Sequence, residues 1–394
     1  MAQDDILNTL PVGRLGIIAL ESFKPIAEKV DDYIVEWRYN RSSDDLESIH
    51  FNDYKRDSYL IDTVCPRFGS GEAKGLIKES VRGDDLYFLV DITNYSITYS
   101  VCGHESCMSP DDHFSDLKRL IGAVGGKARR ITVIMPFLYE GRQHKRSARE
   151  SLDCAIALQE LVNMGVDSII TFDAHDPRVQ NAIPLHSFET VQPTYQFIKA
   201  LLRKAPDITL DTDHLMVVSP DEGAMGRAVY FGNVIEADVG MFYKRRDYTK
   251  IVGGRNPIVA HEFLGSNVEG KDIIIIDDMI SSGESMLDCA RELKERKAKR
   301  IFICATFGLF TSGMQGFDEA YKNGTFDLLI TTNLVYQPEA LLSRPDYTTA
   351  DMSKYIALLI DSLNHDLSIS EFLNPTDRIQ RYVSKYKAKQ KKQG

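Results

Sequence analysis

Two adjacent carboxylates end a strongly apolar run, and a loop of small, hydroxylated residues follows them. The run is IIIIDDMISSGES, residues 273–285, in which the acids are Asp277 and Asp278. The loop residues that could hold an anion are Ser281, Ser282, Gly283 and Ser285. Carboxylates accept hydrogen bonds from vicinal sugar hydroxyls, and loop amides at the start of a helix attract an anion. The pattern therefore favours a ligand with sugar hydroxyls and a phosphate, although the acids could simply cap the next helix.

Glu284 lies inside this loop and carries the wrong charge for a phosphate site. Its carboxylate is unfavourable there unless the side chain points to water or caps the helix. We expect it to point away, so that only its backbone amide serves the site.

A second feature that could act on phosphates is a dense basic group beside a glycine-containing loop. In YKRRDYTKIVGGRNPI (243–258), Lys244, Arg245 and Arg246 precede Gly253 and Gly254. Cations at the root of such a loop predict a mobile lid that brings positive charge to phosphates. The alternative is an exposed basic hairpin.

The elements that must position these residues share one pattern, in which a β-branched run leads into a small-residue loop and then an amphipathic helical stretch. Segments of this pattern lie at 129–177, 214–228, 271–310 and 326–333. Continuous apolar strands that alternate with helices indicate parallel sheets covered on both faces. Because the pattern occurs in both halves, we predict an α/β protein with two similar domains in tandem. Polar residues at the carboxyl ends of the strands are then the expected ligand contacts.

Composition excludes several classes of protein. The chain has 394 residues, a net charge of −10 and six cysteines. The acidic balance argues against a general nucleic-acid binder. No run of 18 apolar residues predicts a membrane span, and six cysteines in a chain of this length do not predict a disulfide framework. We expect a cytoplasmic protein with reduced thiols.

Taken together, these motifs resemble one family. IIIIDDMISSGES is similar to the ribose-phosphate binding loop of type I phosphoribosyltransferases, and residues 65 to 365 resemble ribose-phosphate pyrophosphokinase, also called phosphoribosyl-pyrophosphate synthetase. The other collinear blocks are RFGSGEAKGLIKESVRGDDLYFL, KARRITVIMPFLYEGRQHKRSARES, IITFDAHDPRVQ, VVSPDEGAMGRA and YKRRDYTK. The resemblance implies two phosphoribosyltransferase-like domains. The first is 1–190, with the ATP segments and with 352–394 returning to it, and the second is 191–351, with the ribose 5-phosphate loop and the catalytic flexible loop.

The implied reaction is Mg²⁺-dependent transfer of the β,γ-diphosphoryl group of ATP to the 1-hydroxyl of ribose 5-phosphate. Its products are AMP and 5-phosphoribosyl 1-diphosphate for nucleotide biosynthesis. By the resemblance, Lys244 and Arg246 are catalytic, and their spacing lets both face one side of an extended segment, while His175 and Asp221 hold the Mg²⁺. ATP would be bound by Phe68, Ser70, Glu72, Arg142 and Gln143. Ribose 5-phosphate would be bound by Asp277, Asp278, Ser281, Ser282, Gly283, Glu284 and Ser285.

Four positions depart from the family's pattern and keep two alternatives open. Ser70, His144 and Ser281 stand where acids are usual, and Glu284 stands where glycine is usual. One alternative is a catalytically weak regulatory homologue that associates with an active synthetase. The other is a phosphoribosyltransferase, in which Ser281 would be common. The retained Lys244 and the ATP segments favour the synthetase over both.

Three further stretches carry weaker expectations. Residues 1–64 match the family poorly. Without the family pattern around it, Phe68 could equally be a core residue. Residues 102–113, with Cys102, His104, Cys107 and His113, could bind zinc, but their spacing fits no standard pattern and favours a surface insertion. The basic tail RIQRYVSKYKAKQKKQG is expected to be a frayed, solvated end. The family also implies a homo-oligomer, with dimers that assemble into a hexamer, and ATP and ribose 5-phosphate as small-molecule partners.

Overall fold

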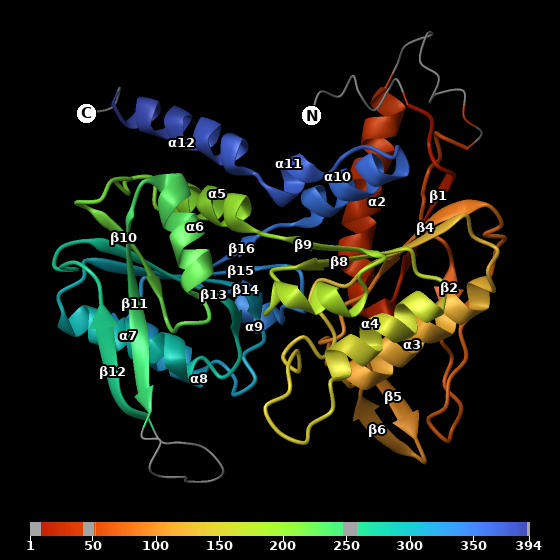
Figure 1. Ribbon diagram of the computed structural model, residues 1–394, viewed down its shortest axis with the longest axis horizontal. Coiled ribbons are helices and arrows are strands. Elements are labelled where there is room, and N and C mark those ends of the chain that lie inside the picture. Colours follow the sequence, from red (N-terminus) through yellow and green to blue (C-terminus); the bar gives the residue numbers. More distant parts are fainter. Residues whose placement is uncertain (1–8, 42–50, 52, 247–257, 392–394) are drawn as a thin grey trace. The chain divides into compact units, whose positions relative to one another are not determined.

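The chain forms two compact units, which we describe separately (Figure 1). The computed structural model describes residues 9–41, 51, 53–246 and 258–391. Unit 1 comprises Met1–Gln192, Asn333–Tyr336 and Asp351–Asn374, and unit 2 comprises Pro193–Thr332, Gln337–Ala350 and Pro375–Gly394. Because residues 375–394 belong to unit 2, the expectation that all of 352–394 returns to the first domain is wrong for this stretch.

Unit 1 is built on a five-stranded parallel sheet with the strand order β1-β4-β7-β8-β9. These strands are β1 (Arg14–Ala19), β4 (Asp84–Leu89), β7 (Arg130–Ile134), β8 (Ser168–Phe172) and β9 (Ser187–Val191). Two short antiparallel pairs stand apart from it, β2 (Thr63–Val64) with β3 (Leu76–Ile77) and β5 (Thr98–Val101) with β6 (His104–Cys107). The helices are α2 (Lys24–Asn40), α3 (Pro110–Val124), α4 (Asp153–Asn163), α10 (Ser353–Asn364) and α11 (Ser370–Leu373), with 3-10 turns η1 (Glu21–Phe23) and η3 (Pro177–Ala182).

Helices cover both faces of this sheet, as continuous apolar strands require. In Figure 1, α3 and α4 lie on one face and α2 and α10 on the other. Every residue of β4 is buried, so this strand has no solvent-facing side. The main core joins Phe88 and Val133 of the strands to Leu117 of α3 and Leu158 of α4. Burial on both faces explains why the strands read as unbroken apolar runs.

Helix α3 has capping residues at both of its ends. Ser109 accepts a hydrogen bond from the Asp112 backbone amide, and the Asp112 side chain accepts one from the Ser109 amide, which completes a capping box. Pro110 occupies the first turn, and Gly125 ends the helix at a φ of 59°. These caps fix the start of α3 directly after the β5–β6 hairpin.

A buried ionic cluster joins α2 to α10 within unit 1. Asp361 accepts hydrogen bonds from Arg38 Nε at 3.0 Å and from Arg41, and all three side chains are almost fully buried. Arg38 Nη2 also donates to Asn364 at 2.7 Å. Removing one partner from such a cluster would leave an uncompensated buried charge, which costs about 3–5 kcal/mol. Helix α10 is therefore held firmly to α2, although Arg38 and Asp361 are 323 positions apart in the sequence.

Unit 2 is built on a seven-stranded sheet with the order β12-β11-β10-β13-β14-β15-β16. All neighbours are parallel except β11 and β12, which are antiparallel. The strands are β10 (Leu215–Ser219), β11 (Asp238–Arg246), β12 (Ile258–Leu264), β13 (Asp272–Ile280), β14 (Arg300–Gly308), β15 (Leu328–Thr332) and β16 (Tyr347–Ala350). The helices are α5 (Thr194–Lys204), α6 (Met225–Ile235), α7 (Glu284–Glu295), α8 (Gln315–Lys322), α9 (Glu339–Leu342) and α12 (Thr376–Gln390).

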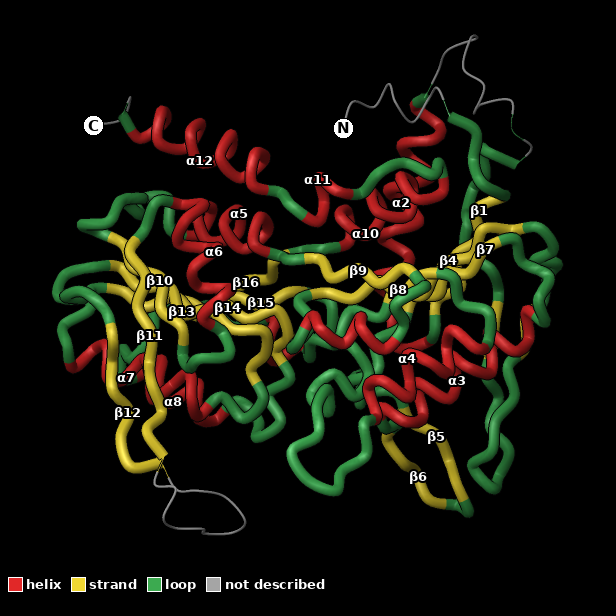
Figure 2. The backbone as a smooth tube through the Cα atoms, viewed as in Figure 1, coloured by secondary structure: helices red, strands yellow, loops and turns green. Residues whose placement is uncertain are grey.

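Two cores lie on opposite faces of the second sheet. Figure 2 shows α5, α6 and α12 on one face and α7 and α8 on the other. Along β13 the faces alternate, because Ile274 and Ile276 pack in the first core while Ile273 and Ile275 pack in the second. The two domains are thus both parallel-sheet α/β units, and the predicted fold class is confirmed.

The basic tail was predicted to be frayed, and this prediction is wrong. It forms α12, in which Ile379 and Val383 are buried in the core with α5 and α6. The Tyr386 hydroxyl donates to the backbone oxygens of Pro206 and Ile208 at 2.9 and 2.8 Å. The apolar residues recur every three or four positions, which is the helical signal that the basic composition concealed. Among the described residues, no helix is long and apolar enough to cross a membrane.

Candidate active site

In unit 2, the two predicted sugar-binding acids lie near the carboxyl end of β13. Asp278 is buried, and its backbone amide donates to Asp277 Oδ1 at 2.8 Å. Burial, the neighbouring Asp278 and, to a lesser degree, Asp221 raise the pKa of Asp277 well above its usual range. Carboxylates with raised pKa values favour a ligand that donates hydrogen bonds or carries positive charge.

Asp221 follows β10, the strand beside β13, at the corresponding end of the sheet. Its Oδ1 accepts hydrogen bonds from the Gly223 and Ala224 amides at 2.9 and 3.3 Å, which fixes the side chain across a tight turn. Arg227, in α6, places Nη2 3.7 Å from Asp278 Oδ2. We did not predict a role for Arg227, although it lies in the quoted segment VVSPDEGAMGRA. Three acids and one arginine therefore meet at this edge of the sheet.

The loop between β13 and α7 has the backbone of an anion site. Gly283 has a φ of 89°, and an added Cβ there would lie 2.4 Å from Phe317 Cε2, so this position requires glycine. No side chain caps the first turn of α7 at Gly283, and the Glu284 amide donates to Ser282 Oγ at 3.4 Å. Glu284 is exposed in the first helical turn, which agrees with the expectation that it points to water. The loop therefore leads into the positive end of a helix, which attracts an anion.

In unit 1, the predicted adenine-contact loop projects into solvent. Phe68 is 53% exposed, so the alternative that it is a core residue is wrong. The loop is a tight turn in which the Phe68 amide donates to Glu72 O at 2.7 Å. Ser70 Oγ donates a hydrogen bond to Glu72 Oε2 at 2.9 Å. Both residues were predicted to contact ATP, and in this structure they contact each other. An exposed aromatic ring on a braced loop suits stacking against a flat ligand.

The β5–β6 hairpin braces this loop from the side. The Cys102 amide, at the hairpin turn, donates to Gly69 O at 2.8 Å. An added Cβ on Gly71, whose φ is 91°, would lie 3.0 Å from Val101 Cγ2. The Arg67 guanidinium stacks over Tyr99 at 4.7 Å from the ring centre. The surface insertion predicted from the sequence is therefore also a support for the loop that carries Phe68.

The residues of 102–113 that could have bound zinc do not come together in the structure. Cys102 and Cys107 are exposed on the hairpin, whereas His113 is buried in α3. The imidazole of His113 hydrogen-bonds Asn94 O through Nε2 at 2.9 Å. In the part of the chain that the structure describes, no three His, Cys, Asp or Glu side chains are grouped as a metal cluster.

The loop after β7 carries the predicted phosphate-contact residues. Arg142 is exposed, and Gln143 Nε2 donates to Ser151 O at 2.9 Å, so the glutamine closes the loop on itself. His144 turns toward the next strand's loop, where its Nε2 lies 3.4 Å from Asp176 Oδ2. Its ring centre lies 5.5 Å from that of His175. His144, which departs from the family pattern, is therefore a neighbour of the predicted metal ligand His175. The sequence did not reveal this contact.

His175 itself is exposed beyond β8. The backbone is held by Asp176, which caps η3 through the Arg178 amide at 2.9 Å. A hydrogen bond from the Arg178 side chain is the main reason that the pKa of Asp176 lies well below its usual range. Asp176 stays ionised beside His144 and His175, whereas Asp173 is buried at a φ of 42°.

The predicted catalytic residues can be placed only by their backbone. Lys244 and Arg246 lie in β11, where Lys244 pairs with His261 of β12. The register shifts between Arg245 and Arg246, and such a shift interrupts strict alternation along a strand. The side chains of residues 244–246, and the loop with Gly253 and Gly254, lie outside the described residues.

Comparisons with known proteins point to one family. Residues 15–165 match the family model of the N-terminal domain of ribose phosphate pyrophosphokinase, and residues 255–374 match that of the phosphoribosyl synthetase-associated domain. A crystal structure of phosphoribosylpyrophosphate synthetase from Mycobacterium smegmatis has the same fold. It aligns with a TM-score of 0.70 at 21% identity over 90% of this chain and 99% of that chain.

Curated relatives match this chain over most of their own length. A ribose-phosphate pyrophosphokinase from Vibrio parahaemolyticus is 29% identical over 319 residues, which are 80% of this chain and 92% of the relative. One from Shewanella oneidensis is 29% identical over 79% of this chain and 90% of its own. The chain belongs to the ribose-phosphate pyrophosphokinase family, which is a family of enzymes.

Proposed function

We propose that the protein transfers the β,γ-diphosphoryl group of ATP to the 1-hydroxyl of ribose 5-phosphate, with AMP and 5-phosphoribosyl 1-diphosphate as products. The observation that carries the proposal is the end of β13, where Asp277 and Asp278 adjoin a serine-glycine loop that opens into α7. Acids for sugar hydroxyls and the N-terminus of a helix for a phosphate match the two ends of ribose 5-phosphate.

In the proposed reaction, the sugar's anomeric oxygen attacks the β-phosphorus of ATP, and the bond from that phosphorus to the oxygen of AMP breaks. Asp277 and Asp278 would accept hydrogen bonds from the ribose hydroxyls, while residues 281–285 would hold the 5-phosphate. The exposed ring of Phe68 supports a role in holding adenine, and Arg142 is free to reach phosphate oxygens. Most of the rate enhancement would then come from positioning and from cations at the transferring group.

Magnesium fits the residues present. Asp221 and Asp277 are close enough for each charge to disfavour the other, and a divalent cation would offset that repulsion. Asp221 and His175 are the residues that we propose to hold the ion. When bound, Mg²⁺ would neutralise phosphate charge and help to orient the triphosphate.

An assay of AMP release tests the proposal. AMP should form only when ATP, ribose 5-phosphate and Mg²⁺ are all present. Lys244→Ala should lower the rate by at least about 10²-fold while leaving the melting temperature unchanged. Lys322→Ala, a charge removal on α8, is the matched control and should keep normal turnover.

Two outcomes would favour the other functions considered. ATP binding without AMP release would indicate a regulatory homologue. Transfer from 5-phosphoribosyl 1-diphosphate to a nucleobase, without consumption of ATP, would indicate a phosphoribosyltransferase. The proposal includes a cytoplasmic homo-oligomer, and sedimentation of the purified protein as a monomer would contradict that part.

A further inference from the structure

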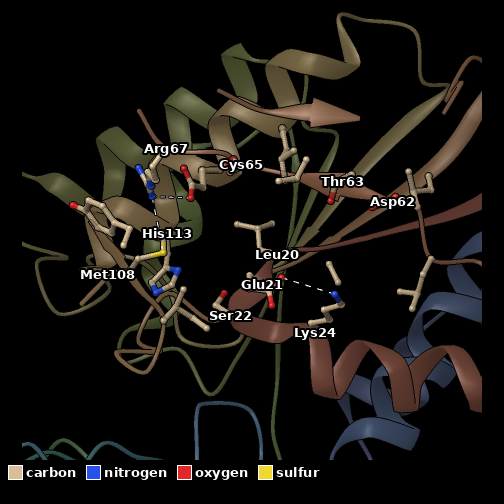
Figure 3. A pocket seen from close by; sticks show the side chains of 18 of the residues that line it. Leu20, Glu21, Ser22, Lys24, Asp62, Thr63, Cys65, Arg67, Met108 and His113 are labelled. Atoms are coloured by element: carbon tan, nitrogen blue, oxygen red, sulfur yellow. Dashed lines mark hydrogen bonds and ion pairs between the residues drawn. The ribbon is translucent and has the colours of Figure 1, made fainter. Parts of the chain in front are cut away.

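Unit 1 contains a cavity that the proposed reaction does not use. It has a volume of about 360 Å³ and lies beyond the carboxyl end of β1, beside the first turn of α2 (Figure 3). Its apolar wall includes Leu20, Met108 and Leu120, which are all buried. Ligand sites of open α/β sheets occur at this end of the strands, and cavities of about 300–1,000 Å³ accept small molecules. The position and volume are therefore those of a small-molecule site.

One end of the cavity carries uncharged polar groups that are not fully satisfied. Ser22 is 5% exposed, and its Oγ has no hydrogen-bond partner among the described residues. His113 uses Nε2 to reach Asn94 O at 2.9 Å, and no hydrogen bond to its Nδ1 is found in the described part of the chain. Asn94 also donates from Nδ2 to Ser22 O at 2.8 Å, so one buried residue positions both groups. A buried hydroxyl without a partner costs free energy, which a bound ligand could recover.

The His113 ring is neutral in this setting. Desolvation by burial is the largest influence on it and lowers its pKa below the usual value. The Nε2 atom then carries the proton that is donated to Asn94 O, and Nδ1 is an acceptor. A ligand at this end meets an acceptor at His113 and a hydroxyl at Ser22.

Charges around the cavity are already paired with one another. Arg67 contacts Asp116 at 2.8 Å, and Asp62 contacts Lys78 at 2.9 Å. Lys24 lies 4.0 Å from Glu21, as the dashed line in Figure 3 marks. A charged ligand would have to break one of these pairs or lie beside a like charge, whereas an uncharged ligand would disturb none of them.

We propose that this cavity binds an uncharged heterocyclic molecule of at most nucleoside size, which donates a hydrogen bond to His113 and makes a second one with Ser22. Phe68 and the residues after β13 are not among those that line this cavity. The proposal does not depend on the reaction proposed above, because binding can be measured without turnover.

Equilibrium dialysis with radiolabelled adenosine, an uncharged heterocycle with donors and acceptors, tests the proposal on the full-length protein. Adenosine should bind in the cavity in addition to any binding at the loop that carries Phe68. AMP should bind in the cavity at least about tenfold more weakly, because its phosphate would have to displace Glu21 or Asp62 from the lysines with which they pair. Ser22→Ala should weaken adenosine binding by about fivefold, the loss expected for one neutral hydrogen bond. Thr63→Phe, which narrows the cavity from β2 and leaves Ser22 and His113 intact, should abolish binding.

Three controls separate this site from the candidate active site and from misfolding. Phe68→Ala removes the adenine contact of the proposed active site, so the adenosine that still binds to this variant should be bound in the cavity. Ser100→Ala, which removes an exposed hydroxyl from β5, should leave binding in the cavity unchanged. Ser22→Ala should melt at or above the wild-type temperature, since the hydroxyl that it removes has no hydrogen-bond partner in the part of the chain that the structure describes. The proposal is overturned if adenosine does not bind, if AMP binds more tightly at this site, or if Phe68→Ala abolishes binding while Ser22→Ala does not.

Discussion

The ionised carboxylate of Asp277 would serve the proposed sugar site, but it lowers the stability of the fold. Burial and the adjacent Asp278 raise its pKa, so the ionised carboxylate destabilises the folded chain at neutral pH. We predict that Asp277→Asn raises the free energy of unfolding by about 1 kcal/mol and lowers AMP release by roughly 10²-fold. Urea denaturation and the AMP assay measure the two effects.

Asp278→Asn is the matched control for this prediction. Asp278 lies 3.7 Å from Nη2 of Arg227, so its removal loses an attraction as well as a repulsion. We therefore expect little or no gain in stability from this second variant. A gain in Asp278→Asn with none in Asp277→Asn would mean that the unfavourable charge had been assigned to the wrong residue.

A second residue-scale prediction concerns pH, because two buried groups of unit 1 titrate in the same range with opposite effects. Burial raises the pKa of Asp91 from 3.8 to about 6, whereas burial lowers the pKa of His365 from 6.5 to about 4. The folded chain holds the Asp91 proton too tightly, so this group's contribution to stability falls as pH rises from about 4 to 6. The folded chain binds the proton of His365 more weakly than the unfolded chain does. The contribution of His365 to stability therefore rises as pH rises over the same range.

The two contributions should largely cancel in the wild type, and each should appear when the other is removed. Asp91→Asn should give a free energy of unfolding that rises with pH between about 4 and 6, relative to wild type, by up to about 3 kcal/mol. His365→Gln should show the opposite trend against wild type. Urea unfolding at several pH values measures both, and parallel curves for all three proteins would refute the assignment.

At the scale of elements, the β5–β6 hairpin supports the loop that we propose to contact ATP. The hairpin holds the loop through the Cys102 amide and through the packing of Val101 against Gly71. The Met108 amide already donates to Ile97 O at 2.8 Å, so residues 98–107 can be replaced by two glycines without stretching the backbone. We predict that this deletion raises KM for ATP by roughly tenfold or more and leaves KM for ribose 5-phosphate unchanged.

Steady-state kinetics with each substrate varied in turn checks this prediction. Ser106→Ala, on the exposed strand of the hairpin, is the control and should behave as wild type. An unchanged KM for ATP in the deletion variant would show that the Phe68 loop keeps its shape without the hairpin.

The same elements show how far sequence reasoning extends. The buried strands β7, β8, β10, β13 and β15 fall inside the segments predicted for them, because a parallel strand covered on both faces needs an unbroken apolar run. Residues 147–166 have helical spacing in the sequence, but α4 begins only at Asp153. In the β5–β6 hairpin, β5 alternates polar and apolar residues but β6 has no such pattern, and α12 was hidden because its few apolar residues stand among lysines and arginines. Exposed elements leave a weaker signal than buried ones.

The candidate site shows the same limit. Asp277, Asp278 and Gly283 could be found because adjacent acids and a glycine-containing loop are local in sequence. The approach of His144 to His175, and of Arg227 to Asp278, joins residues from different strands and loops. Spacing along one chain does not encode such contacts. The cavity beside Ser22 is a further example, since its walls come from β1, β2 and α3.

At the scale of the whole molecule, the proposed reaction divides its two substrates between the two units. The proposed ATP contacts Phe68 and Arg142 belong to unit 1, and the loop after β13 that we propose to bind the sugar phosphate belongs to unit 2. Each unit has its own sheet and its own cores, so a surface substitution in one should leave the other folded. Substrate affinities should therefore be separable by mutation.

We predict that Phe68→Ala raises KM for ATP by roughly tenfold and leaves KM for ribose 5-phosphate within twofold, because one stacking contact is worth about 1–3 kcal/mol. Ser282→Ala should do the reverse by about fivefold, since it removes one hydroxyl from the phosphate loop. Initial rates of AMP release over a grid of both substrates give the two constants for each variant. The double variant should show both changes with no interaction between them, as expected for contacts to different substrates. If Phe68→Ala raised KM for ribose 5-phosphate as strongly as KM for ATP, the assignment of one substrate to each unit would have to be abandoned.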